Sequence, residues 1–480
     1  MSGNKLIKNT TIYALGDIIP KLIGFISLPI LTQYLTPADY GIVNYVNTLN
    51  TFLLALGFLS LNTYFLVFFY RCKSKVEQKK LLGNLSTFIL LLNTVIVGFL
   101  LIFGDYVFEA LGSNIDFYPY IVIAIFTNFF NLFSILPSAL FRVLERPMPL
   151  TILNISRGLI AFALTLILVI LYDYTALGVL YANLVVNFIF AFVFMFMIRN
   201  HIVWNLDFNK IKSALKFSLP LVPGAIAYYL TTISDRILID KYLSLAELGI
   251  YGIAATIAFI LNIFSFGAYK AFEPYIFKNW GSEQFPKIFQ NIRNNFVYVL
   301  FIGVLLLSLF AKEFFVLMTD PQFHEAYIYV PMIIIGVYSS STALLYGTII
   351  TARGKTKINS LIVIVGATIS VTLNIIFLPK FGLLTAAFVS SFAMTVMLML
   401  SIRFSKFSIS HARPILSCLL VAISIYIMVY LVKIDQLLLS ILLKILVFIL
   451  VMFGVTIILS VNPIKIIRGF LSKEKKIIPE

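Results

Sequence analysis

Long apolar segments alternate along the chain with short polar ones. Each apolar segment can cross a bilayer, because about 20 residues at a rise of about 1.5 Å per residue span the hydrocarbon core. The pattern predicts an all-α integral membrane protein with about fourteen transmembrane helices. The expected spans are 10–34, 41–69, 82–104, 118–140, 150–171, 176–198, 217–240, 249–271, 293–311, 326–350, 358–378, 383–403, 414–432 and 437–461.

The first span, 10–34, differs from the others because it carries charges and prolines. Asp17 and Lys21 are four residues apart and therefore share one helix face. Pro20 lies between them and removes a backbone donor, which predicts a kink. Charged groups are costly in hydrocarbon, so these two should face a bundle interior or a water-filled cavity. A charged, broken helix of this kind is typical of transporters.

Basic residues gather on one side of the predicted membrane. Of the 36 Lys and Arg, 28 fall in the termini, the even-numbered gaps and the span ends that border them, four in the odd-numbered gaps and four deeper inside spans. The positive-inside rule then places both termini in the cytoplasm. The net charge of +16 is accordingly interpreted as orientation and lipid-surface charge, and no nucleic-acid partner is expected.

Composition narrows the function classes. The chain is 61% hydrophobic and 12% charged, and its two cysteines predict no disulfide framework. It has no nucleotide-binding, dinucleotide-binding or zinc-ligand motif, so we expect no catalytic residue, no metal and no cofactor. A membrane polysaccharide polymerase or glycosyltransferase stays open as an alternative. Such enzymes usually need a large extramembrane loop, and the expected external gaps are short.

The chain also repeats itself. The segment YLTPADYGI at 34–42 returns as YLSLAELGI at 242–250, and Arg146 after the fourth span has a counterpart in Arg353 after the tenth. Six spans per repeat is an even number, so the halves are predicted to be parallel repeats related by an axis along the membrane normal. The last two spans are then an extra pair.

Three motifs resemble the polysaccharide/O-antigen (Wzx-type) flippases of the multidrug, oligosaccharidyl-lipid and polysaccharide exporter superfamily. They are YLTPADYG at 34–41, ERPMP at 145–149 and SLPLVPGAIAYYLTTISDRILIDKYLSLAELGIY at 218–251. The resemblance implies a pseudo-twofold pair of six-helix lobes around a central cavity. It divides the chain into an N-lobe at 1–200, a C-lobe at 201–410, and helices 13 and 14 with a basic tail at 411–480.

The same resemblance implies a function. The expected activity is alternating-access export of an undecaprenyl-diphosphate-linked oligosaccharide across the bacterial cytoplasmic membrane, from the inner to the outer leaflet. Polysaccharide assembly proteins and membrane lipids would be its partners. Two alternatives share the fold: a cation-coupled multidrug exporter and a lipid II flippase.

Candidate substrate-binding residues follow from the chemistry of that substrate. Its diphosphate needs cations, and Lys21, Arg157 and Arg236 lie within apolar spans. Local ion pairs with Asp17 and Asp235 are the alternative interpretation for Lys21 and Arg236. Its sugar needs polar groups facing water, and amides in membrane helices face partners or water. The candidates for the cavity wall are Asn44, Asn47, Asn128, Asn131 and Asn154, with Asn183 and Asn187 nearby in sequence. For ion coupling the candidates are Asp17 and, less favoured because of its adjacent arginine, Asp235.

The charge distribution yields a labelling prediction. A cysteine placed at Asn114, in the external segment 104–117 that has no Lys or Arg, should react with a membrane-impermeant reagent added to intact cells. The native Cys72, in the basic cytoplasmic segment 71–80, should not react until the membrane is opened. The reverse pattern would contradict the predicted orientation.

Overall fold

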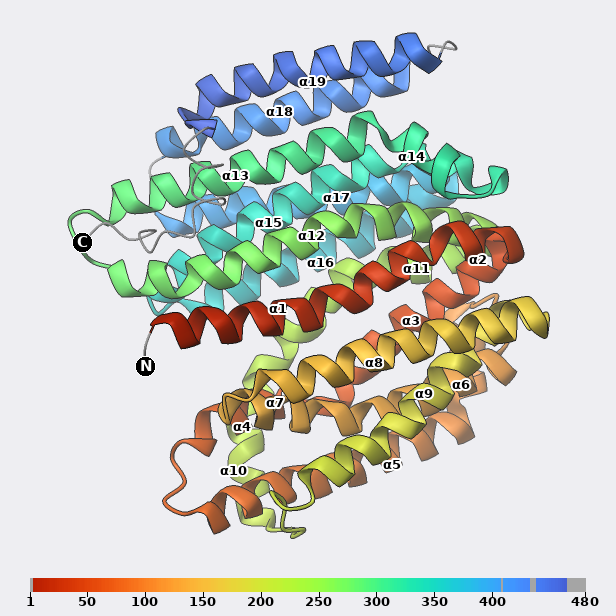
Figure 1. Ribbon diagram of the computed structural model, residues 1–480, viewed down its shortest axis with the longest axis vertical. Coiled ribbons are helices and arrows are strands. Elements are labelled where there is room, and N and C mark those ends of the chain that lie inside the picture. The colour runs from red at the N-terminus through yellow and green to blue at the C-terminus, as the bar shows by residue number, and fades with distance from the viewer. Residues whose placement is uncertain (1–2, 407–408, 432–436, 464–480) are drawn as a thin grey trace. The chain divides into compact units, whose positions relative to one another are not determined.

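A computed structural model describes residues 3–406, 409–431 and 437–463, and that part of the chain is helical with no strand (Figure 1). Ten of its helices are long and apolar enough to cross a bilayer, or twelve if each of two bent pairs forms one span. The predicted all-helical, multi-pass architecture is therefore confirmed. The predicted first and thirteenth spans do not reach this length and apolarity within the described residues, and the count of fourteen stays a prediction.

The first compact unit comprises Met1–Ile253 with Met318–Phe323 and Ser370–Ala386. Within it α8 packs against α1 and α9, and α6 lies between α9 and α3 (Figure 1). Its helices and turns are α1 (Gly3–Ile26), α2 (Leu28–Tyr34), α3 (Pro37–Phe58), α4 (Leu61–Phe69), α5 (Lys75–Leu111), η1 (Phe117–Ile121), α6 (Val122–Asn131), η2 (Leu132–Ser134), α7 (Ile135–Val143), α8 (Pro147–Leu166), η3 (Ile167–Leu171), α9 (Thr175–Ile198), α10 (Phe208–Ser218), η4 (Leu219–Leu221), α11 (Val222–Tyr242) and the start of α12 (Leu245–Asn279).

The second unit comprises Ala254–Leu317, His324–Ile369 and Ala387–Glu480. Its helix α13 contacts α15, α18 and α19. The remaining elements are α13 (Phe285–Leu309), α14 (Ala311–Met318), η5 (Pro321–Ile328), α15 (Val330–Ala352), α16 (Thr356–Phe381), α17 (Leu383–Ser405), α18 (Ile409–Leu431) and α19 (Leu437–Leu459), of which η5, α16 and α17 are shared between the units. The two-lobe division at 200 and 410 stays a prediction.

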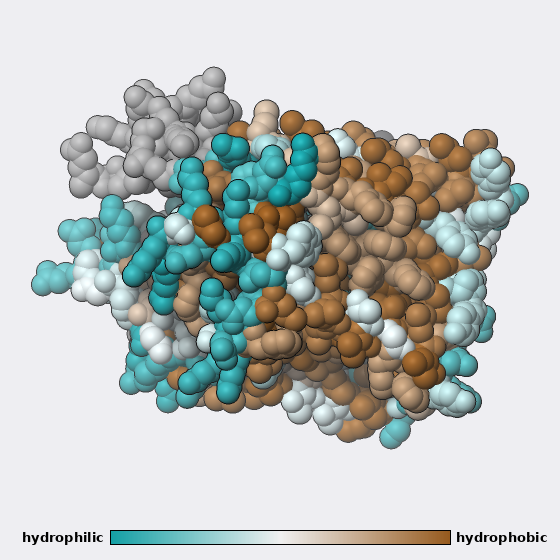
Figure 2. Space-filling model, turned by 90° about the horizontal axis from the view of Figure 1, so that it is seen from below, coloured by the Kyte–Doolittle hydropathy of each residue, from teal (hydrophilic) through white to brown (hydrophobic). Residues whose placement is uncertain are grey.

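The face drawn in Figure 2 has the surface expected in a bilayer. Hydrophobic residues form a continuous area, and hydrophilic residues gather at its two ends. Exposed large apolar side chains on α5, such as Val95, Ile102 and Tyr106, would be unfavourable in water and are favourable against lipid.

The first predicted span is divided into two helices, and the kink at Pro20 stays a prediction. α1 continues through Pro20 to Ile26, and the break comes at Ser27, with Pro29 in the first turn of α2. Proline is well placed at the start of a helix because its missing N–H has no intrahelical partner there.

The repeated segment starts a helix in both copies, with the same cap. Thr36 and Asp39 exchange side-chain and backbone hydrogen bonds at the start of α3. Ser244 and Glu247 do the same at the start of α12. Such a capping box satisfies two backbone donors that would otherwise be unpaired at the helix N-terminus.

These two helix starts contact each other reciprocally. A Cβ added at Gly41 would collide with the carbonyl oxygen of Leu245, and one added at Gly249 would collide with the carbonyl oxygen of Pro37. The offset of the repeat, 208 residues, converts the first contact into the second. A local twofold axis therefore passes between the two starts, and glycine is required because backbone meets backbone.

This geometry predicts that Gly249→Ala lowers the melting temperature of the purified protein, because overpacking costs about 1–3 kcal/mol. Gly41→Ala should have a similar effect, since the contact is symmetric. Gly267→Ala is the matched control on the same helix, because a Cβ there meets nothing within 4 Å. Equal melting temperatures for Gly249→Ala and Gly267→Ala would contradict the close contact.

Candidate functional site

A polar cavity of about 280 Å³ lies inside the first unit, between α3, α6, α8 and α9. Amides form most of its wall, and none of its lining residues is acidic. Polar side chains can line it because four helices shield them from lipid while leaving a space that holds water. The lining residues are Asn47, Asn50, Thr51, Leu54, Thr127, Asn128, Asn131, Arg157, Asn183 and Asn187.

Arg157 is the cation of this cavity. Its Nη2 donates to Asn131 Oδ1 at 2.9 Å and also to Asn187 Oδ1. Both acceptors are neutral amides, and among the described side chains no carboxylate pairs with Arg157. The guanidinium has five N–H donors in a planar fork, so donors remain for an anion entering the cavity.

Hydrogen bonds fix the amides that surround Arg157. Asn128 donates to the backbone oxygen of Asn50 at 2.8 Å, which joins α6 to α3. Asn187 donates to the backbone oxygen of Asn183, one turn earlier, at 2.7 Å. Because each amide nitrogen is engaged with backbone, its oxygen is free to face the cavity or the guanidinium. The wall is thus preorganised before any ligand enters.

Four of the predicted cavity residues meet in this site: Asn47, Asn128, Asn131 and Arg157. Asn44 and Asn154 do not line it. Asn44 is one turn from Asn47, but it donates to the carbonyl of Tyr40 and its side chain packs against Gly252. Sequence spacing gives the helix face but not the neighbour that the face meets.

The other predicted charges lie elsewhere. Lys21 is exposed on α1 and does not line the cavity. The side chain of Asp17 lies outside the described residues. Asp235 and Arg236 are buried together on α11, with Arg236 Nη1 3.6 Å from Asp235 Oδ1, and the Tyr251 hydroxyl donates to Asp235. The local ion pair considered for Arg236 is therefore present.

Sequence reasoning missed Asn50, which lines the cavity, and Asp240, which is 1% exposed at the end of α11. Asp240 accepts from Ser113 Oγ at 2.7 Å and from the Asn114 backbone N–H at 3.2 Å. It looked like a loop residue because it comes just before Lys241, at the boundary of the predicted span.

Hydrogen bonds also join the end of α2 to residues 320–322. Gln322 donates to the carbonyl oxygens of Thr32 and Leu35, and the Asp320 backbone N–H donates to Thr32 Oγ1 at 3.2 Å. These contacts and those of Asp240 join segments from the two halves of the repeat within the first unit. They lie near the turns before α3 and α12, close to the twofold contact of Gly41 and Gly249.

Comparison with known proteins shows the family to which the chain belongs. The family model described as polysaccharide biosynthesis protein matches residues 6–280, which is more than half of the chain. The chain belongs to this family. A second model, MatE, matches residues 220–376.

Two curated relatives share 25% identity with the chain. The capsular polysaccharide biosynthesis protein CapF of Staphylococcus aureus aligns over 398 residues, 80% of this chain and 94% of CapF. An uncharacterized membrane protein of Haemophilus influenzae aligns over 283 residues, 57% of this chain. The chain spans only 65% of that relative's length.

Among solved structures, the lipid II flippase MurJ in an inward closed conformation superposes with a TM-score of 0.67 and 15% identity. The match covers 91% of this chain and 97% of that one. At this identity the likeness shows the fold. Together with the family membership, it confirms the resemblance drawn from the three motifs: a multi-pass, MATE-like membrane protein of the polysaccharide exporter superfamily.

Proposed function

We propose that this protein is a flippase that moves an undecaprenyl-diphosphate-linked oligosaccharide from the inner to the outer leaflet of a bacterial cytoplasmic membrane. It would work by alternating access, without enzymatic chemistry, and with both termini in the cytoplasm. Membership of the polysaccharide biosynthesis family supports the substrate class. The single observation that carries the proposal is Arg157, a cation in a polar membrane cavity whose acceptors are amides.

The cavity matches the two polar parts of such a substrate. A diphosphate accepts hydrogen bonds along planar edges, which the guanidinium fork satisfies in pairs. A sugar both donates and accepts hydrogen bonds, as the surrounding amides do. The isoprenoid chain would stay in lipid, since nothing in the wall of this cavity suits a long apolar tail.

A multidrug exporter of the same fold is less well supported. Cationic drugs are best held by carboxylates, and the described lining of the cavity has none. Lipid II also carries undecaprenyl diphosphate, so Arg157 suits it equally well. Paired transport assays with lipid II and with a lipid-linked capsular repeat unit separate these two substrates.

Coupling to an ion gradient is assigned to Asp17. The α1 backbone around it packs closely on α8: a Cβ at Gly16 would lie 2.8 Å from Thr151 Oγ1, and one at Gly158 would lie 3.2 Å from Pro20 Cβ. A protonation change on α1 could therefore be transmitted to the helix that carries Arg157. Asp235 is the weaker candidate, because Arg236 and the Tyr251 hydroxyl already pair with it.

Arg157→Ala should weaken binding of a diphosphate lipid by roughly ten- to a hundredfold, because a charge-assisted hydrogen bond contributes about 1.5–3 kcal/mol. Arg157→Lys should restore only part of the affinity, since lysine keeps the charge without the planar fork. Binding is measured on purified protein beside a neutral lipid with the same tail, and thermal stability is recorded in parallel.

Asn131→Asp provides the sharper test of the same site. The new carboxylate would neutralise Arg157 in place, so diphosphate binding should fall as in Arg157→Ala while the melting temperature is kept or raised. Asn291→Asp, at an exposed asparagine on α13 that does not line the cavity, is the matched control. If both aspartates leave the ratio of the two lipid affinities unchanged, Arg157 is structural and the anion site is wrong.

Asp17→Asn should abolish gradient-driven transport in proteoliposomes while the protein remains folded, because an amide cannot bind and release a proton at this position. Asp105→Asn, which removes an exposed carboxylate within α5, should transport normally. Equal transport by Asp17→Asn and the parent protein at every imposed ion gradient would remove Asp17 from coupling.

A further inference from the structure

A second site lies in the first unit, at the end where α5 begins and α7 and α9 finish. Three basic residues follow or precede a shared apolar cluster there. Leu82, Val143, Ile198 and Ile202 pack together in that cluster. Lys79 is three residues before Leu82, Arg146 three residues after Val143, and His201 directly before Ile202. The packing of the cluster therefore brings together the three chain segments that carry these basic residues.

Two further observations join these residues. The Val203 backbone N–H donates to the carbonyl oxygen of Lys79 at 3.2 Å, which fixes the chain after His201 against α5. Burial lowers the pKa of His201, and the charges of Arg146 and Lys79 lower it further, so both cations act on the imidazole. His201 Nδ1 is buried without a hydrogen-bond partner in the described structure.

The carboxylates nearby in sequence have other roles. Glu77 accepts from the Lys73 backbone N–H at 2.7 Å, at the start of α5. Asp207 accepts from the Asn209 and Lys210 backbone N–H groups at the start of α10. Glu145, directly before Arg146, also makes an interaction, and among the described residues no ion pair joins Lys79 or Arg146 to a carboxylate. Two permanent cations and an imidazole with an unsatisfied nitrogen thus form a site suited to an anion.

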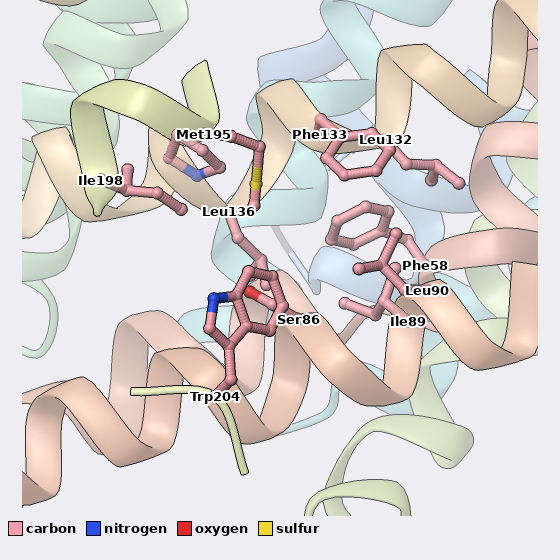
Figure 3. A pocket seen from close by; sticks show the side chains of 11 residues that line it. Phe58, Ser86, Ile89, Leu90, Leu132, Phe133, Leu136, Met195, Ile198 and Trp204 are labelled. Atoms are coloured by element: carbon pink, nitrogen blue, oxygen red, sulfur yellow. The ribbon is translucent and has the colours of Figure 1, made fainter. Parts of the chain in front are cut away.

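An apolar groove adjoins the same cluster, because Ile89, Leu136 and Ile198 belong to both. Figure 3 shows the Trp204 side chain pointing toward Leu136 and Met195, with Ile89, Leu90 and Phe58 to one side. Phe58, Leu90, Leu132, Phe133, Pro137 and Ile198 complete the lining. Ser86, its polar residue, is seven residues after Lys79 on α5, a distance of roughly 10 Å along the helix. The groove and the cations are therefore about as far apart as a lipid phosphate and the upper part of its acyl chain.

The surroundings place this site at the boundary between lipid and water. Trp204 is 47% exposed and Phe208 is 73% exposed, and both follow His201 closely in the chain. Exposed aromatic residues next to cations are typical of the headgroup level of a membrane. The helix α10 that follows carries exposed Lys212 and Lys216.

We propose that Lys79, Arg146 and His201 bind the phosphate of an anionic phospholipid whose acyl chain lies in the groove under Trp204. The apolar groove alone would accept any lipid, and the cations alone would accept any phosphate. Their arrangement selects a molecule that has both parts. This site is separate from the Arg157 cavity and does not depend on what that cavity transports.

Contact quenching by brominated lipids tests the proposal directly. The chain has two tryptophans, so Trp280→Phe leaves Trp204 as the only one. This variant is reconstituted in phosphatidylcholine vesicles with increasing fractions of brominated phosphatidylglycerol or brominated phosphatidylcholine. Trp204 fluorescence should be quenched by both lipids, with a relative binding constant at least about fivefold higher for phosphatidylglycerol, since a cation near an anionic lipid surface contributes roughly that factor.

Two double variants in the Trp280→Phe background test which basic residues cause the preference for phosphatidylglycerol. Lys79→Gln with Arg146→Gln should reduce the binding ratio to about one. Lys212→Gln with Lys216→Gln removes the same charge from the same end of the unit and should leave the ratio unchanged. The melting temperature and emission maximum of each variant are measured to check that it is folded. If the Lys79→Gln and Arg146→Gln double variant does not fold, Lys79→Gln alone replaces it.

Several outcomes would overturn the proposal. Equal quenching by the two lipids in the Trp280→Phe protein would exclude a phosphate-selective site. If both double variants lose the preference for phosphatidylglycerol equally, that preference comes from diffuse positive charge and not from this site. Loss of the preference on adding millimolar inorganic phosphate would assign the cations to free phosphate, and absence of quenching by either lipid would show that Trp204 does not face lipid.

Discussion

A cation inside a bilayer must be solvated by the protein, and most of the first unit is arranged around this requirement. Arg157 is solvated by the amide oxygens of Asn131 and Asn187. A carboxylate would stabilise the charge more strongly but would also cancel it. Amides lower the cost of burial and leave the positive charge in the cavity. Because amides carry no charge of their own, the positive charge remains available to an anion.

The packing of α8 follows from the same requirement. Gly158, next to Arg157, lies against Pro20 of α1, and Thr151 donates to the Ile12 carbonyl of α1 at 2.9 Å. Adjacent residues on a helix point about 100° apart, so small residues against α1 turn the arginine toward α6 and α9. Close packing through small residues is the usual means of helix association in membranes, where lipid competes with every apolar contact. The glycine therefore sets the direction of the cation.

Much of the fold and part of the candidate site could be predicted from the sequence. The remaining features could not, for physical reasons. Apolar length located most of the helices, and the repeat marked two equivalent helix starts but not their contact at Gly41 and Gly249. Asn47, Asn128, Asn131 and Arg157 were recognised because polar groups in membrane helices need partners or water. Asn44 and Asn154 met the same criterion but lie elsewhere, because a single chain pattern does not state which helix faces which. The partners of Asp240 and the site of Lys79, Arg146 and His201 depend on loops, where no periodicity constrains the chain.

The twofold contact is compatible with the proposed alternating access, which requires it to separate. Pro37 and Leu245 meet the glycines through backbone atoms, and nearby the Asn44 side chain of α3 packs against Gly252 of α12. The hydrogen bonds of Asp240, Gln322 and Asp320 would be broken, each contributing about 0.5–1.5 kcal/mol or somewhat more for the carboxylate. Water would replace most of them. Their total exceeds the roughly 1.5–3 kcal/mol that a diphosphate would gain from Arg157, so occupation of the cavity would offset only part of the cost of opening.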